Sequence, residues 1–236
     1  MYENEDYQEF RTTPRVKSQT NYFARIFGWV FAALGLTAAI ATGVYFLLAS
    51  GIIPVDWYYG LLIGSSIAYL VLMMVIQIRI LRRRASGKSL TIPFVLYTVV
   101  MGITLSVYLI YFDVPLLLTA FGITALTFGS MALYGALTKR NLNVMGMIAF
   151  SAMIGAFGLA LFNIFMQSES IYWIISFVMF GAVMLITAFD TWQMKNEIIL
   201  GRMDDTSAMY FAFRLYVDFI YLFVRIVSFL AAGRRR

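Results

Sequence analysis

Long apolar runs separated by short polar connections set the pattern of this chain. A helix needs about 20 apolar residues to cross the hydrocarbon core of a bilayer. Seven runs reach or approach this length, and the last is more polar than the others. The runs are approximately Tyr22–Ala49, Tyr58–Ile78, Ile92–Tyr111, Leu116–Leu137, Val144–Met166, Ile171–Asp190 and Ser207–Ala232. The pattern predicts an all-α polytopic membrane protein with seven transmembrane helices.

The connections between the runs are short, which indicates one domain. We expect residues 1–21 to be a flexible N-terminal tail, 22–232 the seven-helix domain and 233–236 a basic C-terminal tail. Of the 236 residues, 61% are hydrophobic and only 13% are charged, whereas soluble domains carry about 25% charged residues. The surface is therefore expected to face a lipid bilayer. A transmembrane barrel would instead show alternating segments of about ten residues.

The basic residues lie in alternate connections, which predicts an orientation. Three Lys or Arg precede the first run, five separate the second and third, two the fourth and fifth, and two the sixth and seventh. The other connections have none, so the N-terminus is expected to be cytoplasmic. The net charge of +6 therefore reflects orientation and not nucleic-acid binding. The terminal Arg234–Arg236 would then lie outside if the seventh helix crosses, which we favour over a re-entrant helix.

Composition also limits the chemistry. With no cysteine and no histidine, the chain has no disulfide, thiolate nucleophile or usual zinc ligand set, and we expect no bound cofactor. Histidine is also the usual switch near neutral pH. We expect a multi-pass protein of the plasma membrane, or of the endoplasmic reticulum if the source is eukaryotic. Nothing in the residues identifies a protein partner.

Two aspartates, Asp190 and Asp218, lie within runs that otherwise read as membrane spans. An ionisable group at bilayer depth costs about 2.5 to 3.5 kcal/mol on insertion scales and usually marks an ion or proton path. Helical rise places Asp190 about 28 Å from the outer end of the sixth run, and Asp218 at most about 17 Å from the cytoplasmic side. Antiparallel neighbours would bring the two carboxyl groups to similar depth.

The seventh run carries three charges on one stripe. At about 100° per residue, Arg214, Asp218 and Arg225 share a narrow face, which a lipid-facing helix could not tolerate. The helix is therefore expected to be enclosed by the others, with Arg225 a candidate for the wall of a polar path. A purely structural alternative pairs Arg214 with Asp218 four residues away and Asp190 with Lys195.

If the two aspartates touch, their chemistry is constrained. Two adjacent carboxylates in a low-dielectric site cannot both ionise cheaply, so they would share one proton and titrate as a pair. Loss of that proton would drive the helices apart or admit a cation. Ca²⁺ favours carboxylate and carbonyl oxygens, so Asp190 and Asp218 are also candidates for a transient Ca²⁺ site.

Several segments, in order, resemble the transmembrane Bax inhibitor motif family over nearly all of residues 20–232. They are "TALTFGSMALYGALTKRNLNVMGMIAF", "FNIF", "AFDTWQMK" around Asp190 and "LYVDFIYLF" around Asp218. The resemblance implies six helices, in two layers of three, wrapped around a central C-terminal helix. It also implies a pH-sensitive Ca²⁺ leak whose sensor is a hydrogen-bonded pair, here Asp190 and Asp218. A second-span arginine latches onto this pair in relatives, and Arg79 is the best match, with Arg82 the runner-up.

The chain departs from that family pattern at Arg214, where relatives have an uncharged residue. An arginine one turn from Asp218 would favour its ionised form, so Arg214 could tune the protonation of the pair or replace the latch. The second span also carries Gly64–Ala68 where some relatives have an acidic residue.

Three functions remain open: a pH-gated cation leak, most simply for Ca²⁺, a coupled H⁺/Ca²⁺ exchanger, and a non-transporting regulator of stress or cell death. We do not expect an enzyme. Intramembrane aspartyl proteases carry "YD" and "GxGD", whereas here the contexts are "AFDT" and "YVDF".

Overall fold

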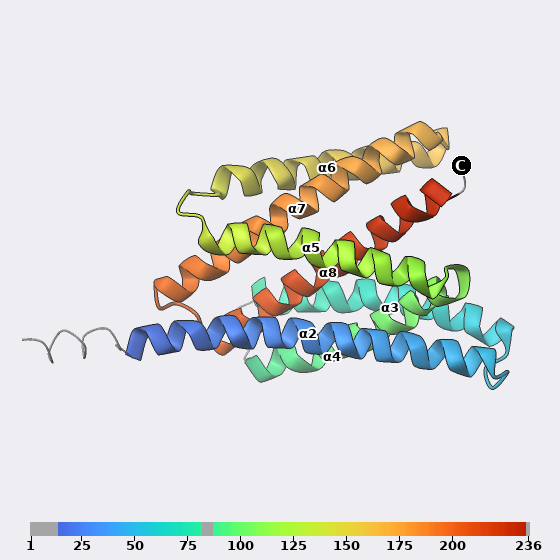
Figure 1. The fold of residues 1–236 in the computed structure, drawn as a ribbon, viewed down its shortest axis with the longest axis horizontal. Coiled ribbons are helices and arrows are strands. Elements are labelled where there is room, and N and C mark those ends of the chain that lie inside the picture. Colours follow the sequence, from blue (N-terminus) through green and yellow to red (C-terminus); the bar gives the residue numbers. More distant parts are fainter. Residues whose placement is uncertain (1–13, 82–86, 235–236) are drawn as a thin grey trace, which may run out of the picture.

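Seven long helices make up the described part of the chain. The computed structural model describes residues 14–81 and 87–234, and Figure 1 shows their arrangement. The helices are α2 (Pro14–Ala49), α3 (Val55–Leu81), α4 (Gly87–Tyr111), α5 (Val114–Leu137), α6 (Asn143–Met166), α7 (Glu169–Ile199) and α8 (Asp205–Arg234). All seven are long and apolar enough to cross a membrane. The predicted fold class is confirmed.

Two helices extend furthest beyond their apolar runs. Helix α2 begins at Pro14, and α7 continues to Ile199. The last turns of α7 have polar residues on one face, but Thr191, Met194 and Ile198 are buried at helical spacing, so this face packs on the protein. Asp190 therefore lies within a continuous helix, nine residues before its last residue.

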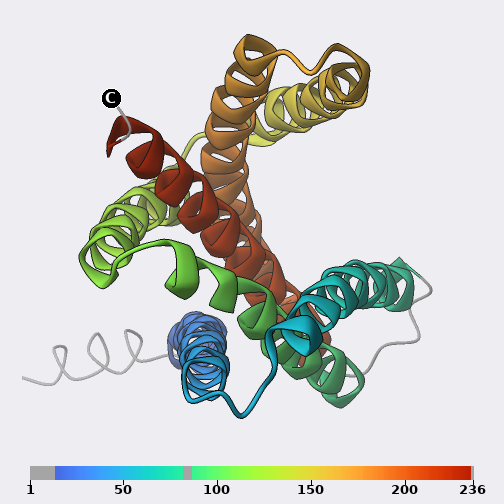
Figure 2. The same cartoon turned by 90° about the vertical axis from the view of Figure 1, so that its right-hand side faces the viewer.

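Helix α8 lies between two layers of three helices. Helices α2, α3 and α4 form one layer, α5, α6 and α7 form the other, and α8 touches α2, α4, α5 and α7. Figure 2 shows α8 running through the middle. Its side chains are buried in several directions, with Ala212, Leu215, Tyr216 and Leu222 fully inaccessible. Helices α3 and α6 lie outermost, packed mainly on α4 and α7 respectively.

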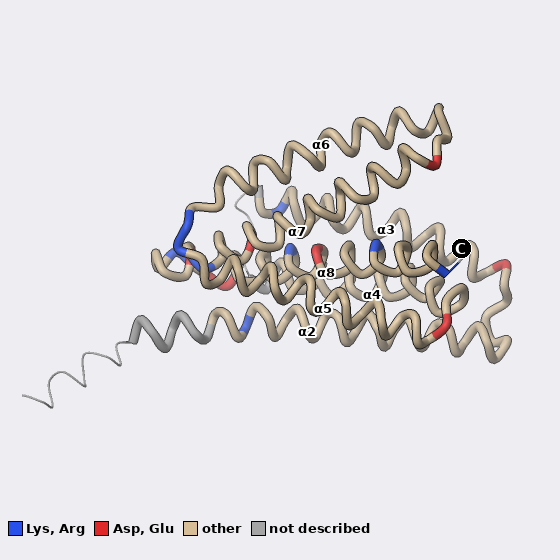
Figure 3. The backbone as a smooth tube through the Cα atoms, turned by 45° about the horizontal axis from the view of Figure 1, so that its top comes forward, with Lys and Arg blue, Asp and Glu red and all other residues tan. Residues whose placement is uncertain are grey.

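Ion pairs hold α8 at both ends. At its start Asp205 accepts a hydrogen bond from Arg25 of α2, and at its end Arg234 donates to Asp113 in the α4–α5 connection. The helix is continuous over 30 residues, a length of about 45 Å. It therefore crosses the whole bundle, as we favoured, instead of turning back. In Figure 3, charged residues gather at the two ends of the bundle, with few in between.

Close helix contact positions α7 beside α5 and α6. A Cβ atom added at Gly135 of α5 would lie 2.2 Å from the carbonyl oxygen of Ala188, and one at Gly146 of α6 would lie 2.7 Å from the Phe189 ring. Small residues allow such close approach of membrane helices. Both contacts lie within two residues of Asp190, so they set the height of α7 at this aspartate.

The start of α8 is capped by Asp204. Its Oδ1 accepts a hydrogen bond from the backbone N–H of Ser207 at 2.7 Å. Hydrogen bonds from the hydroxyl and backbone N–H of Ser207 hold the pKa of Asp204 below its ordinary value. Replacing Asp204 with alanine is expected to lower the free energy of unfolding by about 1 kcal/mol at neutral pH, because a helix N-terminus loses its cap.

The pH dependence of this cap has a defined sign. Because the folded-state pKa of Asp204 is depressed, its contribution is present above the unfolded-state pKa, about 3.9. It is lost as the pH falls through the folded-state value. Unfolding free energies of wild type and Asp204→Ala, measured from neutral to strongly acidic pH, should therefore converge at low pH. A constant difference would contradict this role.

Candidate functional site

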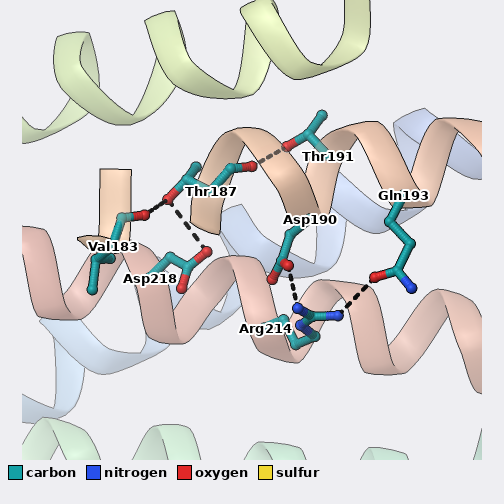
Figure 4. Close-up of polar contacts among 7 residues, drawn as sticks. All are labelled: Val183, Thr187, Asp190, Thr191, Gln193, Arg214 and Asp218. Atoms are coloured by element: carbon teal, nitrogen blue, oxygen red, sulfur yellow. Dashed lines mark hydrogen bonds and ion pairs between the residues drawn. The ribbon is translucent and has the colours of Figure 1, made fainter. Parts of the chain in front are cut away.

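The two predicted aspartates lie on the facing sides of α7 and α8. Asp190 is 1% exposed and Asp218 is 8% exposed. Figure 4 shows both carboxyl groups entering the space between the two helices. Helix α8 directs Arg214, Asp218 and Arg225 toward α7, because all three hydrogen-bond to that helix. The charged stripe predicted for the seventh run is thus the α7–α8 seam.

Arg214 is the positive charge of the site. Its guanidinium forms an ion pair with Asp190 and donates a 3.0 Å hydrogen bond to Gln193 Oε1, also on α7. It lies over the ring of Tyr210, 5.5 Å from the centroid, a geometry that favours a cation. The side chain is only 23% exposed. The structural alternative considered from the sequence paired Arg214 with Asp218 on the same helix. The structure instead pairs Arg214 with Asp190, which joins α8 to α7.

Asp218 is held by a threonine of the opposite helix. Thr187 Oγ1 lies 3.3 Å from Asp218 Oδ2 and 2.9 Å from the backbone oxygen of Val183. A hydroxyl has one proton to donate, so Thr187 satisfies only one of these acceptors fully. If it donates to Val183, its contact with Asp218 is a good hydrogen bond only when Asp218 is protonated and donates in return. The geometry of Thr187 therefore accommodates a protonated Asp218.

One oxygen of Asp190 has no partner among the described residues. Its Oδ1 accepts from Arg214, but its Oδ2 is buried and accepts no hydrogen bond from any residue in 14–81 or 87–234. Buried polar atoms are nearly always satisfied, and an exception calls for an explanation such as an ion, a proton or a functional role. Only one guanidinium lies beside the two carboxyl groups, and it pairs with Asp190. The three groups together are therefore neutral only when one carboxyl group is protonated.

Arg225 extends the seam in the direction of Arg234. It lies seven residues, or about 10 Å, beyond Asp218. Its guanidinium donates hydrogen bonds of 3.0 Å to Tyr221 on the same helix and to Ser176 on α7. Within residues 14–81 and 87–234, no acidic side chain forms an ion pair with it. The hydroxyl groups of Tyr221 and Ser176 thus stabilise the Arg225 guanidinium in place of an acidic side chain.

Other residues were predicted from the sequence to interact with this pair of aspartates. Arg79 is exposed in the last turn of α3, and its role as a latch stays a prediction. Arg82 lies outside the described residues. Lys195 hydrogen-bonds to the backbone oxygen of Thr138 instead of pairing with Asp190.

Thr187 and Gln193 were not singled out from the sequence. Each lies three residues from Asp190 and therefore on the same helix face. Their three-residue spacing from an intramembrane aspartate is the sequence pattern that could have identified them as part of the site.

The cluster does not have the ligands of a resident metal site. Within the described part of the chain, no group of three or more acidic, histidine or cysteine side chains could hold a metal ion. Ca²⁺ takes six to eight oxygen ligands, and Asp190 and Asp218 supply four at most. A cation at this position would therefore keep much of its water.

Comparison with known proteins identifies the family of this chain. Residues 19–235 match the family model described as inhibitor of apoptosis-promoting Bax1. The chain is 33% identical over 232 residues to inner membrane protein YbhL of Escherichia coli K12, covering 94% of this chain and 95% of YbhL. An uncharacterized protein of Deinococcus radiodurans is 29% identical over 210 residues, covering 88% of each chain. The resemblance inferred from the sequence motifs is confirmed, and the chain belongs to the Bax inhibitor-1 family.

Proposed function

We propose that this protein is a pH-sensitive cation leak of the inner membrane, with Ca²⁺ as the permeant ion and Asp190 and Asp218 as the proton-sharing sensor. The observation that carries this proposal is the cluster of two buried carboxyl groups with a single guanidinium, in which Asp190 Oδ2 has no partner. The location follows the relative that is named an inner membrane protein. The Lys and Arg distribution supports a cytoplasmic N-terminus.

The pair is the dominant charge system at this depth. The charged groups on the seam with it both come from α8, namely Arg214 and, two turns beyond Asp218, Arg225. Helices α5 and α6 contain no acidic or basic residue, and the spans of α2 and α4 contain only Arg25, near one end. Protonation of the cluster is therefore governed by Asp190, Asp218 and Arg214.

The proposed mechanism uses the charge balance of these three groups. With one shared proton, the cluster is neutral and the α7–α8 seam is closed. Loss of that proton leaves one uncompensated negative charge at low dielectric, where two carboxylates repel strongly. That charge favours entry of a cation and separation of the two helices. Arg214, which pairs with Asp190 across this seam, takes the latch role that the family resemblance gives to a second-span arginine.

The test is Ca²⁺ flux in proteoliposomes over a range of pH. We expect Asp190→Asn and Asp218→Asn each to remove most of the pH dependence, because asparagine is uncharged at every pH. Asp56→Asn is the matched control, since Asp56 is exposed in the first turn of α3, away from the α7–α8 seam, and its flux should keep the wild-type pH profile.

Other outcomes decide against the leak. An unchanged pH profile in both aspartate variants would exclude the pair as the sensor. Uphill Ca²⁺ movement driven by a proton gradient would identify an exchanger. Absence of flux in wild type, together with equal rescue of a cellular phenotype by wild type and the double variant, would point to a non-transporting regulator.

A further inference from the structure

A groove runs between α2 and α5 along the side of the bundle, separate from the charged seam. It consists of two cavities that share Leu34 of α2 and Phe219 of α8 as lining residues. The first, of about 440 Å³, extends along α2 to Phe46, and the second, of about 320 Å³, extends the other way to Phe23. We refer to both together as the α2–α5 groove.

The groove spans the thickness of a membrane. From Phe23 to Phe46 the helix rises about 35 Å, close to the hydrocarbon core of about 30 Å. An aromatic constriction divides it near the middle, where the Phe219 ring lies 5.6 Å from Phe121 and 5.4 Å from Phe128. Each cavity therefore corresponds to about one leaflet.

The chemistry of the lining excludes polar ligands. Among the described residues, no acidic or basic side chain lines either cavity, and the few polar side chains are threonines and tyrosines. One of them, Thr37, is already hydrogen-bonded to the Tyr216 hydroxyl at 2.7 Å. The groove thus offers mainly apolar contact to an occupant.

The mouth of the groove is continuous with the lipid-facing surface. Phe31 and Phe46 of α2, and Leu118 and Leu133 of α5, line the cavities yet are 58 to 68% exposed. In a bilayer these side chains contact lipid, so hydrocarbon chains reach the groove directly.

The surroundings of the groove identify its occupant. Its lining offers apolar contact along about 35 Å of α2, and its mouth opens on the lipid-facing side of α2 and α5. At that depth of a bilayer, hydrocarbon chains are the apolar groups that surround the protein. We propose that the α2–α5 groove binds phospholipid acyl chains, one from each leaflet, which meet at Phe219.

Photo-crosslinking of the wild-type protein tests this proposal directly. The probe is a phosphatidylcholine with a diazirine in one acyl chain, reconstituted with the protein and mapped by peptide mass spectrometry. We expect adducts to concentrate on the groove lining, including Leu34 and Phe219. Labelling spread evenly over the exposed faces of α3 and α6 would overturn the proposal.

Variants that fill the groove give a second, independent measurement. A Cβ at Gly129, which lines the smaller cavity, meets no atom within 4 Å, and the same is true of Gly155 on α6, outside the groove. Gly129→Trp should retain several-fold less phospholipid after delipidation, measured by native mass spectrometry, whereas Gly155→Trp should match wild type. Ala38→Trp is the equivalent variant for the larger cavity.

The remaining outcomes are also decisive. Equal lipid retention in Gly129→Trp, Ala38→Trp and wild type would overturn the proposal, as would a groove-dependent dimer in the same spectra. Competition by soluble glycerol phosphate would overturn it too, because it would show that a headgroup and not the chain is recognised. Retention that is independent of the headgroup would support it.

Discussion

Replacing Arg214 with glutamine is expected to lower the free energy of unfolding by about 3 kcal/mol at alkaline pH. Removing one partner of a buried ion pair leaves an uncompensated charge and typically costs 3 to 5 kcal/mol. We expect the lower end because Arg214 is 23% exposed. Because glutamine keeps a hydrogen-bond donor for Asp190, the lost stability measures mainly the effect of removing the positive charge.

The loss should shrink as the pH falls. In the variant, the carboxylate without its guanidinium becomes neutral once it takes up a proton, and the electrostatic penalty disappears. Unfolding of the detergent- or bicelle-solubilised protein, followed over a pH series, measures this dependence. A destabilisation of equal size at every pH would contradict the charge argument and point to lost packing instead.

Two comparisons sharpen the Arg214 experiment. Arg202→Gln removes an exposed pair with Glu197 and is expected to change stability by less than about 1 kcal/mol. Adding Asp190→Asn to Arg214→Gln should restore much of the lost stability, because it removes the unpaired charge. A double variant that is no more stable than Arg214→Gln would show that the two residues are not coupled.

Replacing Gly135 with valine is expected to destabilise the protein by at least about 3 kcal/mol or to prevent folding. Its Cβ would lie 2.2 Å from the backbone oxygen of Ala188 and 3.1 Å from Thr191. Overpacking a well-packed site costs typically 1 to 3 kcal/mol, and here the obstacle is backbone, which cannot rotate away. Helices α5 and α7 would have to separate.

Gly129 supplies the matched control on the same helix. An added Cβ there meets nothing within 4 Å, so Gly129→Ala should be neutral or slightly stabilising because alanine favours the helix by up to about 1 kcal/mol. Thermal unfolding of Gly135→Ala, Gly135→Val and Gly129→Ala gives the comparison. A Gly135→Val protein as stable as Gly129→Ala would show that α7 is not held by this contact.

A folded Gly135→Ala protein would also connect packing with the proposed sensor. The displaced carbonyl belongs to Ala188, two residues before Asp190. Moving this turn of α7 would change how Asp190 meets Arg214 and Asp218. We therefore expect an altered pH profile of Ca²⁺ flux in this variant, whereas Gly129→Ala should keep the wild-type profile.

Local patterns were sufficient for much of the site. Helical spacing placed Arg214, Asp218 and Arg225 on one stripe, and the structure puts that stripe against α7. Asp190 was identified because placing a charged side chain in a membrane costs free energy. These inferences succeed because each concerns a single helix and its surroundings. The order of residues along a helix already determines which of them share a face.

Other features depend on how two helices meet. From the sequence, Arg214 was predicted either to form an ion pair with Asp218, four residues away, or to alter the protonation of the aspartate pair. Arg79 was the arginine expected to act as the latch. The structure pairs Arg214 with Asp190, 24 residues away, and brings Thr187 to Asp218. A one-turn shift of α7 along α8 would exchange these partners without changing any local pattern.

The sequence by itself therefore determined the seven-helix membrane fold, the buried aspartates and the family. Only the tertiary structure decided the ion-pair partner of Asp190, its unpartnered oxygen and the groove beside α2. The physical reason is that burial is encoded in the periodicity of each helix, whereas the register between helices is set by contacts such as Gly135 with Ala188. Those contacts join residues that no local spacing relates.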